Sequence, residues 1–420
     1  MAYDVARVRG LYVSLSDGWT YLNAHESVQI PEKVSAGVAT AFRTSASVPV
    51  PEPSSGSHAR AKSNGVPQGA LHIDAARSAI ADLLGSSPGR VVLGPNRDVL
   101  LRSLALAMQP RLRRSANVVL SAYDEDALTQ PFSESEAAVL WSQPDLGSGH
   151  LPAWQYRNLV NGSTRLVVLS AAHRLLGTLA PIGEIADIVH AQSRAWVFVD
   201  ASAYAPYRRI DMEDWGADIV LIDVAALGGP QCAALVFRDT TMFPRLGSVN
   251  PDAPIDSPRK LELGAHQTSL LGGVSPLVDH IANLKPQDDT EDVTLTRSAR
   301  VAASMNQVSQ YTEFLALHLV DSLRWMDKVH IMGVTGEAAS GFGVAQERLP
   351  RLSFLIDGVP AETVHERLLD NGLVTTLTPH DNLLWAMGSE DVGGTVTVAM
   401  AMYNTTHDID QLTRVVASLA

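Results

Sequence analysis

The chain has 420 residues, of which 46% are hydrophobic, with a formal net charge of -13 at pH 7 and a sequence pI of about 5.4. A chain of this length and composition is expected to fill more than one hydrophobic core, which predicts two domains. The acidic balance argues against a nucleic-acid or anionic-membrane partner, because phosphate backbones and acidic lipids repel such a surface.

The cysteine count and the first residues bear on location. Cys232 is the only cysteine, so neither a disulfide framework nor a Cys-rich metal site is expected. Its apolar surroundings in the sequence favour a small buried hydrophobe over a nucleophile. The chain opens without a signal-peptide-like apolar stretch, and no run reaches the roughly 18 apolar residues that cross a bilayer. We therefore expect a soluble, cytoplasmic protein without a bound metal.

Short β-branched runs alternate with helical stretches along the first two thirds of the chain. This alternation is typical of an α/β fold with a mainly parallel sheet. Residues 48–65, rich in Pro, Ser and Gly, indicate a mobile surface loop, and amphipathic patterns at residues 74–85 and 182–193 predict helices. The runs are apolar on both faces, so helices should cover both sides of the sheet. The expected strands are residues 91–94, 117–122, 164–171, 195–202, 217–223 and 233–239.

The last third has a different organisation. After Leu284 the sequence becomes polar and acidic, and a long helical pattern then runs from about Ser298 to Leu323. Beyond it we expect strands and helices of a smaller α+β domain, with strands at residues 329–334, 352–357 and 395–402 and helices at residues 361–372 and the C-terminus. The predicted parts are an N-terminal segment (1–25) that packs with the small domain, a large α/β domain (26–285), and a connecting helix with a C-terminal α+β domain (286–420).

Three segments carry a resemblance to a known family. They are YLNAHESVQIP (21–31), AARSAIADLLG (75–85) and the run at 163–223, which contains STRLVVLSAAHRLLGTLAPIGEIADIVHAQ and VDASAYAPYRRIDMEDWGADIVLID. In order and spacing they resemble the class V aminotransferases and cysteine desulfurases, which are fold-type I pyridoxal phosphate (PLP) enzymes. The resemblance implies a large domain with a mainly parallel sheet of the seven-stranded type, a small C-terminal α+β domain, a homodimer, and PLP as the family cofactor.

The family's Schiff-base lysine lies in a turn of the form Ser-x-His-Lys-x-x-Gly-Pro. The matching turn here, IDVAALGGP (222–230), places Asp223 at the serine and Ala226 at the lysine. No lysine occurs from residue 63 to residue 259, so no amine from the large-domain sheet can form the internal aldimine. Asn382 lies near the position of the desulfurase cysteine. The resemblance therefore implies no catalytic residue of the family type, and no covalently bound PLP.

Most other family positions also differ. Asp200, which in the family pairs with the pyridine nitrogen, is retained, although an Asp after a buried strand is also common as a cap or loop residue. Pro95 in the phosphate loop has no N–H to donate to a phosphate group, and the carboxylate of Asp223 would repel that group. PLP is therefore expected to be lost or weakly bound. The replacements are Glu125 for the ring-stacking histidine, Arg174 for an asparagine, Ala203 for a glutamine, Pro95 in the phosphate loop, Ala265 for a threonine of the neighbouring subunit, and Thr376 for the substrate-carboxylate arginine.

Two functions remain open at this point. The first is a pseudoenzyme that binds an unknown small molecule or protein partner in the old cleft, and the second is an enzyme with altered chemistry that uses Asp200, Glu125, His173 or Arg174. Losing several family residues together favours the first. The residues expected in the degenerate cleft are Asp200, Asn96, Glu125, Arg174, His173 and His266, and Arg97, Arg208, Arg209 and Arg259 are considered for the same anion site, although Arg208 and Arg209 are better interpreted as surface charges.

Overall fold

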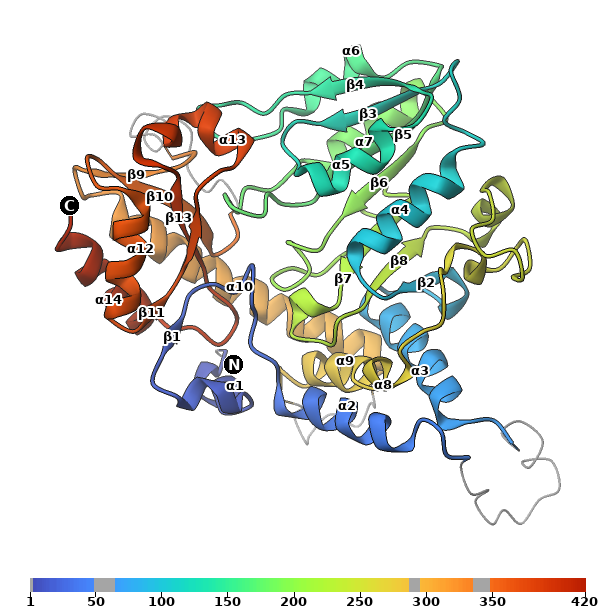
Figure 1. Ribbon diagram of the computed structural model, residues 1–420, viewed down its shortest axis with the longest axis horizontal. Helices are drawn as coiled ribbons and strands as arrows, with labels where there is room; N and C mark the ends of the chain where they lie inside the picture. Colours follow the sequence, from blue (N-terminus) through green and yellow to red (C-terminus); the bar gives the residue numbers. More distant parts are fainter. Residues whose placement is uncertain (1–2, 49–64, 287–294, 335–347) are drawn as a thin grey trace.

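The computed structural model describes residues 3–48, 65–286, 295–334 and 348–420. The surface loop expected at residues 48–65 lies outside these ranges apart from its two end residues. Two lobes lie side by side, the larger one holding the first two thirds of the chain and the smaller one its C-terminal part (Figure 1).

A seven-stranded sheet forms the centre of the large lobe, in the order β2-β8-β7-β6-β5-β3-β4. The pairs among β3 to β7 are parallel, whereas β8 pairs antiparallel with β7 and with β2. All six expected strands are present, which confirms the mainly parallel α/β sheet. The strands are β2 (Val91–Gly94), β3 (Asn117–Ser121), β4 (Ala138–Ser142), β5 (Thr164–Ser170), β6 (Trp196–Asp200), β7 (Ile219–Asp223) and β8 (Ala233–Phe237).

Helices cover both faces of this sheet, as its apolar strands predict. Successive strand residues point to opposite faces, so Val119 joins one buried cluster while Val118 and Leu120 join the other. The cluster with Val119 holds residues of α3 (Gln68–Leu83), α7 (Ile182–Gln192) and α9 (Val274–Ala282), and the other holds residues of α4 (Arg97–Met108) and α5 (Asp126–Ser133). The other helices of this lobe include α2 (Glu32–Thr44), α6 (Tyr156–Leu159) and α8 (Thr268–Leu271), with a 3-10 turn at η5 (Thr240–Arg245).

The small lobe is built on an antiparallel sheet in the order β12-β13-β10-β9. This confirms the expected small C-terminal α+β unit. The N-terminal segment lies against it, because β1 (Thr20–Tyr21) pairs parallel with β11 (Leu373–Val374). The domain limits at residues 25 and 285 stay a prediction. The other elements are α1 (Val5–Arg9), β9 (Val329–Ile331), β10 (Arg351–Ile356), α12 (Ala361–Asp370), β12 (Thr376–Thr378), α13 (Asn382–Leu384), β13 (Thr395–Ala399) and α14 (Thr406–Ala417).

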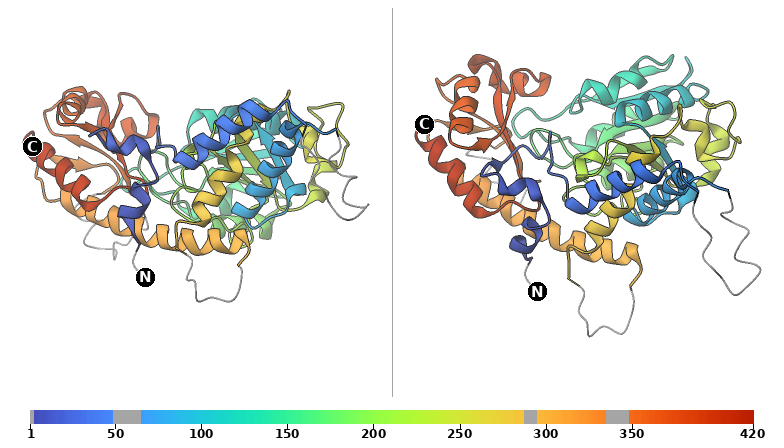
Figure 2. Two further views of the ribbon diagram at one scale, coloured as in Figure 1. Left: turned by 90° about the horizontal axis from the view of Figure 1, so that it is seen from below. Right: turned by 60° about the horizontal axis from the view of Figure 1, so that its bottom comes forward.

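One long helix, α10 (Arg297–Leu323), joins the lobes and runs along both of them (Figure 2). Its first half packs on α3 and α9 and its second half on α14 and β9. Accordingly Val301 and Met305 belong to the core of the large lobe, whereas Leu315 and Leu319 belong to that of the small lobe. The helix thus fixes how the two lobes face each other.

Candidate functional site: a cleft between the lobes

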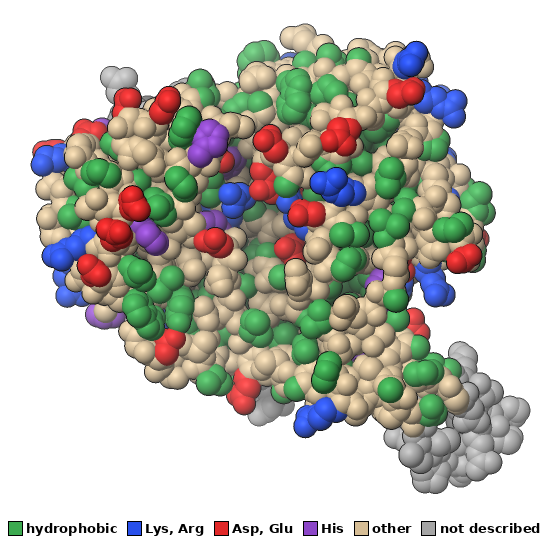
Figure 3. Space-filling view, viewed as in Figure 1, with side chains coloured by type: hydrophobic (Ala, Val, Ile, Leu, Met, Phe, Trp, Pro, Cys, Tyr) green, Lys and Arg blue, Asp and Glu red, His purple; other side chains and the backbone are tan. Residues whose placement is uncertain are grey.

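A cavity of about 580 Å³ opens between the carboxyl ends of the parallel strands and the small lobe. Acidic, basic and histidine side chains gather around a hollow in this region (Figure 3). The large lobe supplies the residues that follow β3, β5 and β6, and the small lobe supplies Arg351 and residues 380–383. Crevices at the carboxyl ends of parallel strands are the usual ligand sites of such sheets. Of the residues named from the sequence, Asp200, Glu125, Arg174, His173, Arg97, Ala203, Asp223, Ala226 and Asn382 line this cleft.

An ion-pair network occupies the centre of the cleft. Arg97 is the first residue of α4, and its Nε and Nη2 atoms both lie 2.6 Å from Oδ2 of Asp200. Its Nη2 also lies 2.7 Å from Oε1 of Glu125, whose Oε2 lies 3.2 Å from Nε of Arg174. Burial opposes the charge of Arg97, but the carboxylates of Asp200 and Glu125 outweigh it and raise the pKa of the guanidinium. The carboxylate of Asp200 therefore has its counter-charge within the chain, in the guanidinium of Arg97.

Two further carboxyl groups border this network. The carboxylate of Asp124 accepts the backbone N–H of Ser170 at 3.1 Å and 3.3 Å, and burial raises its pKa to about 7. Burial also raises the pKa of Asp223, which accepts the N–H of Ala225 at 3.0 Å through Oδ1. Since Asp124 titrates near neutral pH, it can hold or release a proton there.

The opposite wall offers nitrogen donors. Nδ1 of His173 accepts the N–H groups of Leu175 and Leu176, and burial lowers the pKa of His173 to about 4, so the ring is neutral. His25 is also kept neutral, because burial lowers its pKa well below the ordinary value. Within the described residues, neither ring nitrogen of His25 nor Nε of Arg351 has a hydrogen-bond partner. Buried polar atoms without a partner are uncommon in folded proteins, and these belong to residues that line the cleft.

No lysine of the described ranges lines the cleft. Ala226 stands there instead, on a 3-10 turn between β7 and β8. The buried lysine of this lobe, Lys260, lies elsewhere. Its Nζ donates to the backbone carbonyls of Phe243, Leu246 and Ile255, so it is fully used as a structural cation.

Other residues named from the sequence lie outside the lining of the cleft. Asn96 caps α4 by accepting the N–H of Val99 at 2.9 Å, and His266 is bonded to Glu262 at 2.9 Å. The interpretation of Arg208 as a surface charge is wrong, because its side chain is buried and donates to Ser309. Burial raises the pKa of Cys232 to about 12, and its interpretation as a small buried hydrophobe is confirmed.

Thr376 and Arg209, also named from the sequence, lie outside the lining of the cleft as well. Thr376 donates to Glu26 at 2.8 Å, and Nη2 of Arg209 lies 3.2 Å from Asp211. Among the described residues, no group of three or more His, Cys, Asp or Glu side chains is placed to hold a metal ion. None of the helices described is both long and apolar enough to span a membrane.

Sequence reasoning missed several cleft residues, chiefly Asp124, His25 and Arg351. A usable signal existed for Asp124, because polar residues that directly follow buried parallel strands meet at one sheet edge. For His25 and Arg351 no such signal exists, because they enter the cleft from the N-terminal segment and from β10 of the small lobe.

The family model for class-V aminotransferases matches residues 50–285, more than half of the chain. The chain belongs to the class-V aminotransferase family. An uncharacterized protein of Mycobacterium tuberculosis is 38% identical over 423 residues and is covered completely, as is this chain. An aminotransferase-like protein of Gibberella zeae is 26% identical over 359 residues, which cover 81% of each chain. The fold is similar to that of the cysteine desulfurase CsdA from Escherichia coli, with a TM-score of 0.78 at 19% identity, covering 100% of this chain and 98% of that one.

PLP is the cofactor of this family. Within the described residues, the amine required for a Schiff base is missing from the cleft, and Asp200 is already paired with Arg97. The residues present therefore do not fit the family's cofactor in its family role.

Proposed function

We propose that this family member does not carry out Schiff-base PLP chemistry and instead binds a small ligand or a protein partner in the cleft. One observation carries the proposal: the guanidinium of Arg97 lies against the carboxylate of Asp200, both nitrogens 2.6 Å from the same oxygen. By the family resemblance, that carboxylate would pair with the pyridine nitrogen of PLP. In this chain the guanidinium of Arg97 takes the place that the protonated pyridine nitrogen of PLP would have beside Asp200.

The phosphate end supports the same proposal. Asp223, at the family's serine position, would face the phosphate with a carboxyl group instead of a hydroxyl donor. Pro95 removes an N–H from the phosphate loop. A lost hydrogen bond to a charged group costs about 1.5–3 kcal/mol. Two such changes together leave PLP little to hold it without a covalent bond.

The open donors in the cleft suggest the kind of ligand. Among the described residues, His25 and Arg351 carry buried nitrogen atoms without hydrogen-bond partners, and the side chain of Arg174 is partly exposed beside them. The other wall carries Asp124 and Glu125. We propose a small polar molecule with an anionic group that faces His25 and Arg351, and donor groups that face the carboxylates.

The decisive experiment is a PLP titration of the purified chain, followed by borohydride reduction and intact-mass measurement. We expect a colourless protein and no reduced adduct, because no lysine of the described ranges reaches the cleft. A stoichiometric adduct on any lysine would overturn the proposal. A PLP enzyme with its Schiff-base lysine serves as the positive control, and the chain treated with borohydride without added PLP serves as the negative control.

A second candidate is an enzyme with altered chemistry in the same cleft. It is favoured by Asp124, whose pKa of about 7 suits a general acid or base at neutral pH. If co-purified small molecules are turned over by the wild-type chain and not by the Asp124→Asn variant, this second function holds. Binding without turnover by either protein contradicts it.

We further propose a homodimer and a cytoplasmic location. Residues 263–265 of the loop that resembles the family's cross-subunit element are exposed in the single chain, and Leu263 among them is an apolar residue for which a second subunit would provide cover. Light scattering at micromolar concentration should report twice the 45.0 kDa chain mass. A monomer over that range would contradict the dimer. Fractionation of the source cells tests the location.

A further inference from the structure

A second hollow, of about 880 Å³, lies at the opposite end of the sheet from the cleft. Its lining comes from segments that precede the parallel strands: residues 110–116 before β3, 162–165 at the start of β5, and 190–194 before β6, with Arg245 at the end of η5. The cleft residues follow the same strands. The hollow is therefore a separate place on the molecule.

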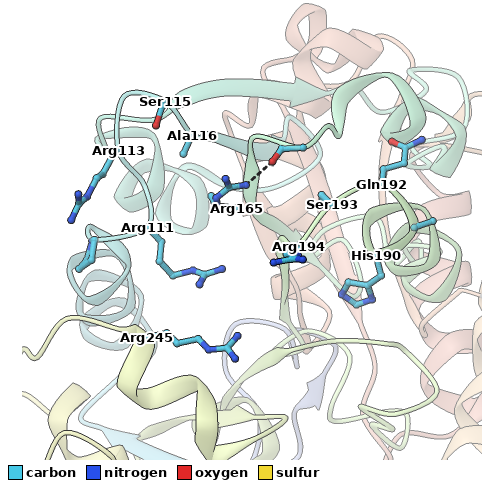
Figure 4. A pocket seen from close by; sticks show the side chains of 13 residues that line it. Arg111, Arg113, Ser115, Ala116, Arg165, His190, Gln192, Ser193, Arg194 and Arg245 are labelled. Carbon is cyan, nitrogen blue, oxygen red and sulfur yellow. Dashed lines mark hydrogen bonds between the residues drawn. The ribbon is translucent and has the colours of Figure 1, made fainter.

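Arginine dominates this hollow. Five of its lining residues are arginines and a sixth is a histidine, and the lining holds no Asp or Glu. Arg111 and Arg245 extend into the middle of the hollow from one side, and Arg165 and Arg194 border it from the other (Figure 4). The five arginines thus form a local positive patch on a chain whose net charge is -13.

These arginines lack the partners that usually explain such residues. Within the described residues, none of these five arginines forms an ion pair with a carboxylate. The neighbouring Arg114, which lies outside the hollow, does have such a partner, 4.0 Å away at Glu136. Arg165 donates only to nearby backbone carbonyls. The guanidinium of Arg111 is stacked over the ring of Trp196, 3.9 Å from its centroid, and its Nε is buried without a hydrogen-bond partner.

The like charges also act on one another. Burial lowers the pKa of Arg111, and the charges of Arg245 and Arg165 lower it further. The carboxylate of Asp218 opposes this lowering, but it already lies 3.1 Å from His190 and 3.4 Å from Arg238. Holding five guanidinium groups together with so little counter-charge costs free energy, and a bound anion would lower that cost. The fork of N–H donors on arginine matches phosphate oxygens in a bidentate manner.

We propose that this hollow binds a small anion that carries two or more phosphate groups, such as a pyrophosphate or a nucleoside di- or triphosphate. A single phosphate, with about two negative charges at neutral pH, would leave most of the five guanidinium charges unbalanced. The five arginines of the hollow lie on four separate segments, so a chain of phosphate groups can contact several of them at once. This inference goes beyond the proposed function of the cleft.

The test is calorimetric titration of the full chain with sodium pyrophosphate and with ATP at constant ionic strength. We expect saturable 1:1 binding that weakens as salt is raised. Arg194→Gln and Arg245→Gln, both at exposed positions, should each weaken it about tenfold, because each removes a charged hydrogen-bond donor. The matched control is Arg114→Gln, which makes the same charge change beside the hollow, in the loop of Arg111 and Arg113, on a side chain that is 89% exposed and outside the lining. It should leave binding unchanged.

Three results would overturn the proposal. The first is an absence of saturable binding of either compound. The second is an equal weakening by Arg114→Gln, which would mean diffuse attraction and not a site. The third is tighter binding of a DNA or RNA oligonucleotide than of pyrophosphate, which would assign the hollow to a nucleic acid. Circular dichroism spectra that match the wild type exclude misfolding of the variants as the cause.

Discussion

Removing the charge of Arg97 should destabilise the protein strongly. The side chain of its partner Asp200 is only 4% exposed and that of Arg97 15% exposed, so Arg97→Gln leaves a carboxylate buried without its counter-charge. Breaking a buried ion pair in this way costs about 3–5 kcal/mol. The N–H of Ser202 still donates to Oδ1 of Asp200 at 2.9 Å in the variant, which favours the lower end. We therefore expect a loss of about 3 kcal/mol in the free energy of unfolding.

Urea unfolding at pH 7, followed by circular dichroism, measures this loss. Adding Asp200→Asn to Arg97→Gln should recover at least half of it, because the carboxylate that lost its partner is then neutral. Arg174→Gln is the matched control: this arginine contacts the same network through Glu125 but is 48% exposed, so its loss should cost less than about 1 kcal/mol. The reasoning is refuted if Arg97→Gln costs no more than Arg174→Gln, or if Asp200→Asn gives no recovery.

Three further predictions concern single residues. The raised pKa of Asp124 means that the folded state holds this proton more tightly than the unfolded state, so its stabilising effect is full below about pH 4 and is lost as the pH rises to about 7. Asp124→Asn should remove this loss, and identical pH profiles of urea midpoints in both proteins would contradict it. Ala226→Lys should give no aldimine absorbance with PLP, because Asp200 remains ion-paired with Arg97 and cannot pair with the pyridine nitrogen. A stoichiometric absorbance band near the usual aldimine wavelength would contradict this. Lys260→Met should cost roughly 3–5 kcal/mol in urea unfolding, because three backbone carbonyls lose their donor, whereas Lys33→Met at an exposed position should cost under about 0.5 kcal/mol; similar losses for both would contradict the structural role of Lys260.

The sequence predicts the large sheet well because its strands are buried on both faces. Continuous apolar runs such as residues 164–171 leave little ambiguity, and β5 matches that run within one residue. The edge strand β4 escapes prediction for the opposite reason. Its apolar run AVLW is only four residues long and is partly exposed, including Trp141, so the sequence alone does not separate it from a surface segment.

The site is harder to predict because its contacts join distant parts of the chain. Arg97 and Asp200 are 103 residues apart in sequence, and nothing local to either indicates their pairing. The family resemblance identifies Ala226 and Asp223 by position, but it cannot show that Arg97 forms an ion pair with Asp200. The arginine hollow is missed for a similar reason, because its members stand singly on four segments.

The long helix α10 has a mechanical consequence for how the cleft meets a ligand. At 1.5 Å per residue its 27 residues span roughly 40 Å, and its sequence contains neither glycine nor proline at which it could bend. It therefore acts as a stiff strut that keeps the large-lobe and small-lobe walls of the cleft at a fixed distance from each other. A molecule that fits would find its contacts already arranged and would spend little of its affinity on closing the lobes. A strut of this kind favours selection by size over adaptation to many shapes.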